Sequence, residues 1–117
     1  MCSLTTNKTA ELNDRLRQKG DPSIGHVMLT SGFSSLHPAI QANALAQMRS
    51  FTDFTEDDDP WGEHDFGALE IEGTKIFWKI AYYDRAAFFS GKEHGSENPE
   101  DGDKTWRVLT VMLAEEY

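Results

Sequence analysis

Apolar residues near the start of the chain recur first at a helical spacing and then in a short strand-like run. Leu12 and Leu16 lie one helical turn apart and predict a helix over residues 9–19, which Gly20-Asp21-Pro22 ends. Because its apolar stripe is narrow, we expect this helix to lie on the surface and to contribute little to the core. Residues 24–30 are rich in β-branched and apolar side chains and predict a strand.

A second helical pattern follows Pro38, a residue that suits the first position of a helix because its missing N–H costs nothing there. The pattern predicts a helix over residues 38–51. Its apolar positions are Ile40, Ala44, Met48 and Phe51. The alanines within it raise helix propensity and allow close packing against a sheet.

Residues 66–72 and 74–83 predict two strands of a hairpin that turns at Gly73-Thr74. Side chains alternate along a strand, so one face of this hairpin is apolar and the other is mostly charged. The expected register pairs Ile71 with Ile76, Leu69 with Trp78, and Glu72 with Lys75. The apolar face then carries Leu69, Ile71, Ile76, Trp78 and Ile80, and the other face carries Glu70, Glu72, Phe77 and Lys79.

The C-terminal part of the chain predicts a polar loop followed by a helix. Residues 90–103 contain three glycines, one proline and five acidic residues, and they show no apolar periodicity. Asp103 is a suitable N-cap for a last helix. The buried face of that helix would hold Trp106, Leu109 and Leu113.

The predicted element order is α-β-α-β-β-α. It indicates a small α+β domain over residues 1–117: a three-stranded, mainly antiparallel sheet with helices packed on one face. With 117 residues, 38% of them hydrophobic, the chain can bury one core. We expect residues 1–8 to fray, and residues 53–65 and 90–103 to form the long loops.

Charge and composition narrow the classes of partner. Twenty acidic residues against eleven basic ones give a net charge of −9, which argues against direct binding of nucleic acid or anionic lipid. The one cysteine, Cys2, allows neither an intramolecular disulfide nor a cysteine-rich zinc site. The N-terminus lacks the apolar core of a signal peptide, and no apolar run approaches the ~20 residues that span a bilayer. We therefore expect a cytoplasmic protein without a membrane contact.

The run from Asp53 to Asp65 holds seven carboxylates and one imidazole, with no Lys or Arg between them. Such a stretch is solvated, bound to a cation or pressed against a basic partner. We favour a basic protein surface as the partner, with Trp61 as an anchor and Tyr83, near the end of the hairpin, as a further contact. The residues assigned to partner binding are Asp57, Asp58, Asp59, Trp61, Glu63, Asp65 and Tyr83.

A bound divalent cation is the alternative, because Glu63, His64 and Asp65 offer carboxylate and imidazole ligands. The protein would then be a metal-dependent enzyme or a metal-binding domain. The spacing is not diagnostic, and alternation along an extended segment directs His64 away from its two acidic neighbours. No nucleophile motif or phosphate-binding glycine loop accompanies these residues. We therefore assign no catalytic residue and no cofactor, and we favour a non-catalytic role.

Four short blocks of the sequence are specific in combination. They are Leu29-Thr30-Ser31-Gly32, Trp61-Gly62-Glu63-His64-Asp65-Phe66-Gly67, Phe77-Trp78-Lys79-Ile80 and the segment from Leu109 to Tyr117. Together they resemble a domain-of-unknown-function family of small proteobacterial and plasmid-borne proteins, which has no established activity or cofactor. The resemblance implies association with mobile genetic elements, whose small acidic proteins include inhibitors of host defence. We therefore expect an anti-defence inhibitor of the anti-CRISPR or antirestriction kind that binds a nucleic-acid-binding defence complex.

Overall fold

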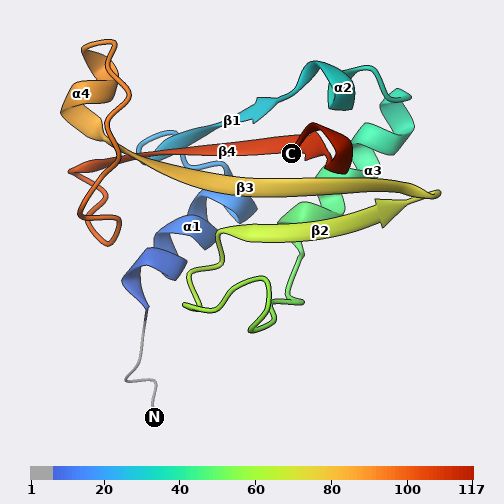
Figure 1. The fold of residues 1–117 in the computed structure, drawn as a ribbon, viewed down its shortest axis with the longest axis horizontal. Coiled ribbons are helices and arrows are strands. Elements are labelled where there is room, and N and C mark those ends of the chain that lie inside the picture. Colours follow the sequence, from blue (N-terminus) through green and yellow to red (C-terminus); the bar gives the residue numbers. More distant parts are fainter. Residues whose placement is uncertain (1–6) are drawn as a thin grey trace.

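The computed structural model describes residues 7–117 and contains one four-stranded mixed sheet with strand order β1-β4-β3-β2 (Figure 1). β1 runs parallel to β4, whereas β3 runs antiparallel to both of its neighbours, β4 and β2. β1 and β2 are therefore the two edges of the sheet. The strands are β1 (Gly25–Leu29), β2 (Phe66–Ile71), β3 (Thr74–Asp84) and β4 (Thr105–Leu113).

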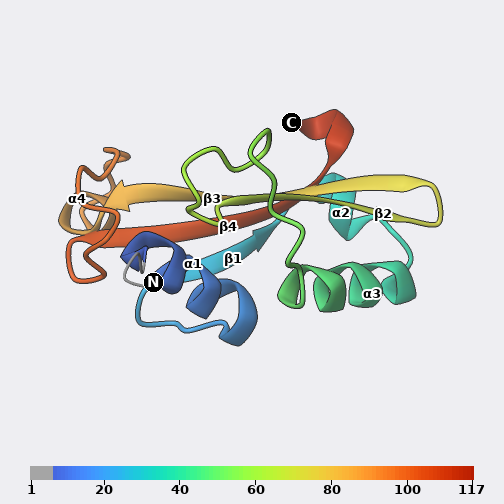
Figure 2. The ribbon, with the colours of Figure 1, turned by 90° about the horizontal axis from the view of Figure 1, so that it is seen from below.

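The two long helices cover one face of the sheet, and the C-terminal 3₁₀ turn lies on the other face (Figure 2). The helical elements are α1 (Lys8–Lys19), α2 (Ser31–Ser34), α3 (Pro38–Arg49), α4 (Arg85–Phe89) and η2 (Ala114–Glu116). The predicted helices over residues 9–19 and 38–51 are thus confirmed as α1 and α3. Of the segment expected to fray, Asn7 caps α1 and Lys8 begins it, and residues 1–6 lie outside the described part of the chain.

The last long element is a strand and not the predicted helix. β4 lies between β1 and β3, and its residues from Thr105 to Leu109 are all buried. A central strand covered on both faces forms a continuous apolar run, which can imitate a helical period by chance. The β-branched residues Val108, Thr110 and Val111 were the local sign of a strand. The α+β class is confirmed, but the three-stranded, mainly antiparallel sheet is corrected to a four-stranded mixed one.

The predicted hairpin is present with a different register. Its turn is Glu72-Gly73, so Ile71 pairs with Thr74 and not with Ile76. Both turn residues have positive φ angles, 49° for Glu72 and 83° for Gly73, as a two-residue turn between twisted strands requires. Because the observed register differs from the expected one by two residues, an even number, every side chain stays on its predicted face.

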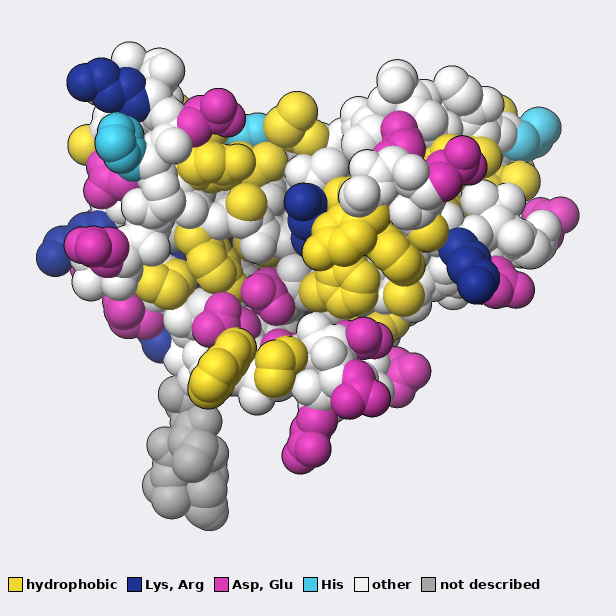
Figure 3. All heavy atoms as spheres, in the orientation of Figure 1, with side chains coloured by type: hydrophobic (Ala, Val, Ile, Leu, Met, Phe, Trp, Pro, Cys, Tyr) yellow, Lys and Arg dark blue, Asp and Glu magenta, His cyan; other side chains and the backbone are white. Residues whose placement is uncertain are grey.

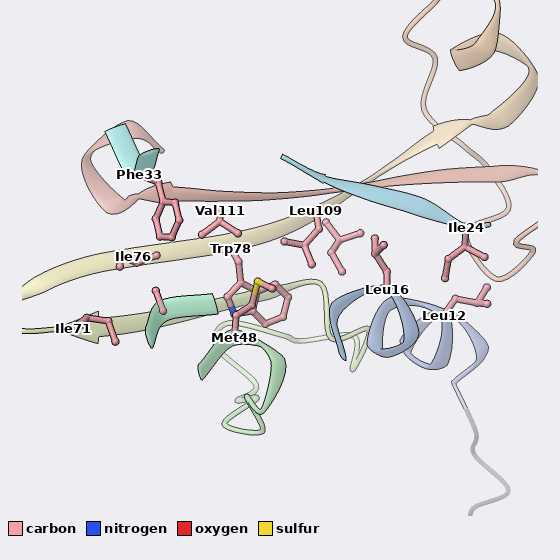
Figure 4. Close-up of a cluster of buried hydrophobic side chains, with 12 residues drawn as sticks. Leu12, Leu16, Ile24, Phe33, Met48, Ile71, Ile76, Trp78, Leu109 and Val111 are labelled. Atoms are coloured by element: carbon pink, nitrogen blue, oxygen red, sulfur yellow. The ribbon is translucent and has the colours of Figure 1, made fainter. Parts of the chain in front are cut away.

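The core lies between the sheet and helices α1 and α3, with the fully buried Trp78 near its centre (Figure 4). α1 contributes more than its narrow stripe suggested, because Leu12 and Leu16 are only 3% and 1% exposed. The polar residues that follow them, Asn13 and Arg17, are buried as well. α1 therefore brings both apolar and polar side chains into the interior.

Glu116 fastens the end of the chain to the start of α2. Its carboxylate accepts hydrogen bonds from the Thr30 hydroxyl at 2.6 Å and from the backbone N–H groups of Leu113 at 2.8 Å and Gly32 at 3.1 Å. These bonds, the Thr30 hydroxyl above all, hold the pKa of Glu116 below its usual range. A side chain at position 32 would collide with the carboxylate. Two of the sequence blocks singled out above therefore meet in space.

Candidate partner-binding site

The acidic run forms a shaped loop between α3 and β2. The buried carboxylate of Asp59 accepts hydrogen bonds from the backbone N–H groups of Glu63 at 2.9 Å and His64 at 3.0 Å. The side chain of Asn7, the N-cap of α1, donates to the Gly62 carbonyl at 3.0 Å. The loop is thus closed on itself by one of its own acidic residues and attached to the first helix. Asp59 has a structural role, because its charge is directed inward.

His64 also joins the loop to α1. Its Nδ1 lies 3.0 Å from Asp14 Oδ1, and its ring stacks on Phe54 with 3.9 Å between centroids. The same Asp14 oxygen pairs with Arg17 at 2.8 Å, and Arg17 donates to backbone carbonyls at the end of α3. The φ angle of His64 is 57°, a left-handed conformation that is uncommon for a residue other than glycine. The two ring contacts hold this conformation in place.

Glu63 points into a buried polar network between the sheet and α1. The Tyr82 hydroxyl donates to Glu63 Oε1 at 2.9 Å, and Asn13 Nδ2 donates to the Tyr82 oxygen at 2.8 Å. Arg107 donates from Nε to Asn13 Oδ1 at 2.6 Å and from Nη2 to the Pro99 carbonyl. Burial raises the pKa of Tyr82 far above its usual range and lowers the pKa of Arg107. The network fixes the loop to the sheet.

Four acidic residues of the loop, Asp59 among them, border an open groove of about 610 Å³ on the sheet face opposite the long helices. Trp61 and Tyr117 stand at this groove, with 81% and 72% of their surfaces exposed. Figure 3 shows an apolar patch on this face, with exposed acidic side chains next to it, lower in the view. The acidic wall consists of Asp57, Asp58, Asp59 and Asp65. The aromatic floor consists of Phe66, Phe77 and Tyr117, whose rings contact one another.

Two charged residues of the groove indicate what it can bind. The Lys79 ammonium lies 5.2 Å from the centroid of the Tyr117 ring, so the aromatic floor already attracts one cation of the chain itself. Asp65 is half-buried, and burial, followed by the nearby carboxylates of Glu63 and Asp59, raises its pKa. A positive charge from a partner would relieve this repulsion. The groove therefore suits a Lys or Arg side chain next to an apolar one.

The structure separates the predicted partner-binding residues into three groups. Asp57, Asp58, Trp61 and Asp65 are accessible at the groove. Asp59 lines the groove, but its carboxylate already accepts hydrogen bonds from the loop backbone, and the Glu63 side chain faces inward. Tyr83 lies near the far end of β3, where it packs against Phe88 of α4, 5.5 Å between ring centroids. Tyr83 therefore does not belong to the groove, and the binding role of the others stays a prediction.

The metal candidates Glu63, His64 and Asp65 do not converge on one point. Glu63 contacts Tyr82, His64 contacts Asp14, and Asp65 faces the groove. Within residues 7–117, no group of three His, Cys, Asp or Glu side chains is arranged to hold a metal ion. The geometry adds no support to the metal alternative.

Sequence reasoning missed the residues that fix the loop. Asn13 and Arg17 follow Leu12 and Leu16 at the same four-residue interval, so polar side chains beside a buried stripe were an available signal. Arg107 could not be found in this way, because its burial depends on the segment being a central strand.

The fold and the groove define a small α+β protein with an acidic, aromatic-lined surface. Residues 29–116 match the family described as "Protein of unknown function (DUF3768)", and the chain belongs to this family. No curated protein and no solved structure matches the chain. The matched span includes the whole acidic groove apart from Tyr117. In the part of the chain that the structure describes, no helix has the length and apolar character needed to cross a membrane.

Proposed function

We propose that this chain is a non-catalytic interaction protein whose acidic groove binds a basic surface of another macromolecule. The observation that carries the proposal is the combination of accessible carboxylates with an aromatic floor and the exposed Trp61. A loop that served only solubility would have no reason to hold a tryptophan at 81% exposure beside Asp57 and Asp58. Aromatic residues at the centre of a charged rim are typical of protein interfaces.

The partner surface that fits best presents Arg or Lys beside an apolar side chain. An arginine can donate two hydrogen bonds to one carboxylate and can also stack on an aromatic ring. Lys79 already lies over Tyr117, which supports cation recognition by this floor. The net charge of −9 would increase the rate at which a basic partner is encountered.

We further infer that the partner is a nucleic-acid-binding defence complex and that the protein inhibits it, as anti-CRISPR and antirestriction proteins from mobile genetic elements do. The support is electrostatic. Duplex DNA carries one charge per about 1.7 Å of axis, and a competitor must hold its carboxylates at fixed positions. Asp59, His64 and Asn13 hold this loop in one shape before any partner binds. The role implies a cytoplasmic location.

The binding test reverses two accessible charges. Asp57→Lys/Asp58→Lys should leave the melting temperature unchanged and weaken partner binding about 100-fold, as loss of close charge pairs at an interface does. Glu93→Lys/Glu97→Lys makes the same change in net charge on the exposed loop after α4 and should bind like the unmodified protein. Affinity capture from host cells, followed by titration of the captured partner, measures both. Equal binding by the two variants would contradict the proposal.

The inhibition test measures DNA cleavage by a panel of purified CRISPR effector complexes and restriction enzymes. At least one enzyme should be inhibited, and inhibition should weaken as salt rises because the contacts are between charges. The Asp57→Lys/Asp58→Lys protein should not inhibit. If a captured partner binds at the acidic groove but no defence enzyme is inhibited, the interaction role stands and the anti-defence role is wrong.

A further inference from the structure

The edge strand β1 exposes three consecutive apolar residues. Val27, Met28 and Leu29 are 40%, 51% and 40% exposed, and β1 is the outermost strand on its side of the sheet. Soluble proteins usually protect such an edge with charged residues, proline or a bulge. β1 has none of these between Val27 and Leu29, so its outer side is open to another strand.

The backbone groups on this open side can be identified from the pairing of β1 with β4. The Ile24 carbonyl accepts from the Arg107 N–H at 2.9 Å, and the Thr30 N–H donates to the Val111 carbonyl at 3.1 Å. Because backbone groups alternate along a strand, those of Val27 and Leu29 point away from β4. Within residues 7–117 no strand pairs with them.

An apolar groove of about 410 Å³ lies beside these residues, between β1 and the C-terminal ends of α1 and α3. Its apolar lining includes Leu16, Val27, Leu29, Leu45 and Met48. Every charged residue of its lining is basic: Arg17, Lys19 and Arg49. Arg17 is buried and paired with Asp14, whereas the exposed Lys19 and Arg49 form no ion pair within the described residues.

We propose that β1 accepts an extended acidic segment of a partner protein as a fifth strand of the sheet. The segment would bond to the outward backbone groups of Val27 and Leu29, place apolar side chains in the groove, and direct Asp or Glu toward Lys19 and Arg49. The positive charges of Lys19 and Arg49 favour an acidic segment as the occupant. A second copy of this chain paired edge to edge would bring its own Lys19 and Arg49 to the same side of the joined sheet, and like charges oppose that arrangement.

This surface is separate from the acidic groove. β1 and β2 are opposite edges of the sheet, and the acidic loop leads into β2. A protein with both surfaces can bind a basic surface in the acidic groove and an acidic strand at the β1 edge. The inference does not depend on the proposed function, because the two surfaces share no residue.

The experiment uses an array of nine-residue peptides in which Val, Ile or Leu alternates with Asp or Glu, and a matched array with Lys in the acidic positions. The best acidic peptides should bind about ten-fold or more tightly than their Lys counterparts. Methylation of alternate peptide amides should abolish binding, because it blocks the main-chain bonds. If no acidic peptide binds in preference to its Lys counterpart, the proposal is wrong.

Two further readouts locate the binding. On peptide binding, the amide hydrogens of Val27 and Leu29 should become protected from exchange, while those of His26 and Met28, directed at β4, should change little. Lys19→Glu/Arg49→Glu should weaken binding about ten-fold or more, whereas Lys92→Glu/Lys104→Glu, an equal charge change at two exposed sites, should not.

Binding without protection of Val27 and Leu29 would overturn the proposal. So would dimer formation that protects the same two amides without peptide, since it would assign the edge to a second copy. Asp57→Lys/Asp58→Lys should leave peptide binding intact, so a failure here is distinguishable from a failure of the acidic groove.

Discussion

The acidic groove lies over β2 and β3 on one face of the sheet, the groove beside β1 lies at the opposite edge, and the two are built in opposite ways. The acidic wall comes from one irregular segment, residues 53–65, and its shape depends on hydrogen bonds between side chains and backbone. The groove beside β1 comes from α1, β1 and α3, and its shape depends on the packing of regular elements.

The comparison shows that a segment rich in charged residues does not present all of its charges to a partner. Asp59 and Glu63 belong to the most acidic segment, yet their carboxylates are hydrogen-bonded within the protein. Lys19 and Arg49 are thirty positions apart in an acidic chain, yet both are exposed at one groove. The fold withdraws some charges from solvent and brings others together.

The largest expected effect comes from a residue that supports both regions. Arg17 lines the groove beside β1, pairs with Asp14 behind the acidic loop, and donates to the Met48 carbonyl at 2.8 Å. Arg17→Ala leaves these partners unsatisfied, and the free energy of unfolding should fall by about 3–5 kcal/mol. Chemical denaturation measures it. Arg15→Ala, on the exposed side of α1, is the control and should cost less than about 1 kcal/mol. A similar loss in both variants would show that Arg17 is not the support that its contacts indicate.

A smaller change should affect the acidic groove alone. Asp59→Ala removes the acceptor for two backbone N–H groups in a partly buried position, and unfolding free energy should fall by about 1–3 kcal/mol. Asp58→Ala, one position earlier and exposed, should change it by less than about 0.5 kcal/mol. Hydrogen exchange at His26 and Met28, whose amides are directed at β4, should be the same in both proteins. Exchange that accelerates there in Asp59→Ala would mean that the two regions are coupled.

The smallest effect concerns the pH dependence of Asp65. Burial and the nearby carboxylates raise its pKa above 3.8, so its charge lowers stability above the raised pKa and has no effect well below 3.8. Asp65→Asn should therefore increase the unfolding free energy at pH 7, by about 0.5 kcal/mol after allowance for solvent screening. The gain should disappear at pH 3. A variant that is less stable at pH 7, or equally stabilised at both pH values, would show that the charge of Asp65 does not destabilise the fold.

The same change should also weaken binding of a basic partner, because Asp65 is one of the accessible carboxylates. The acidic groove would then illustrate a common exchange between stability and function, in which a charge that costs stability is retained for binding.

Local signals were sufficient for several elements. Pro38 and the apolar spacing after it located α3, and the alternation along residues 66–83 assigned each side chain of the hairpin to the correct face. The turn itself was misplaced by one residue, because Glu72 adopts a left-handed conformation that its side chain does not indicate. The acidic loop was recognised from its charge, but the inward orientation of Glu63 was not.

By itself the sequence determined the α+β class, the two long helices, the hairpin faces and the place of the acidic loop, because each depends on residues close together in the chain. Only the tertiary structure decided that Thr105–Leu113 is a central strand, since burial on both faces removes the alternation that marks a strand. It also decided which charges reach a partner. Hydrogen bonds and packing between distant segments, such as Asn13 with Tyr82 and Arg107, determine which side chains are buried and which are presented.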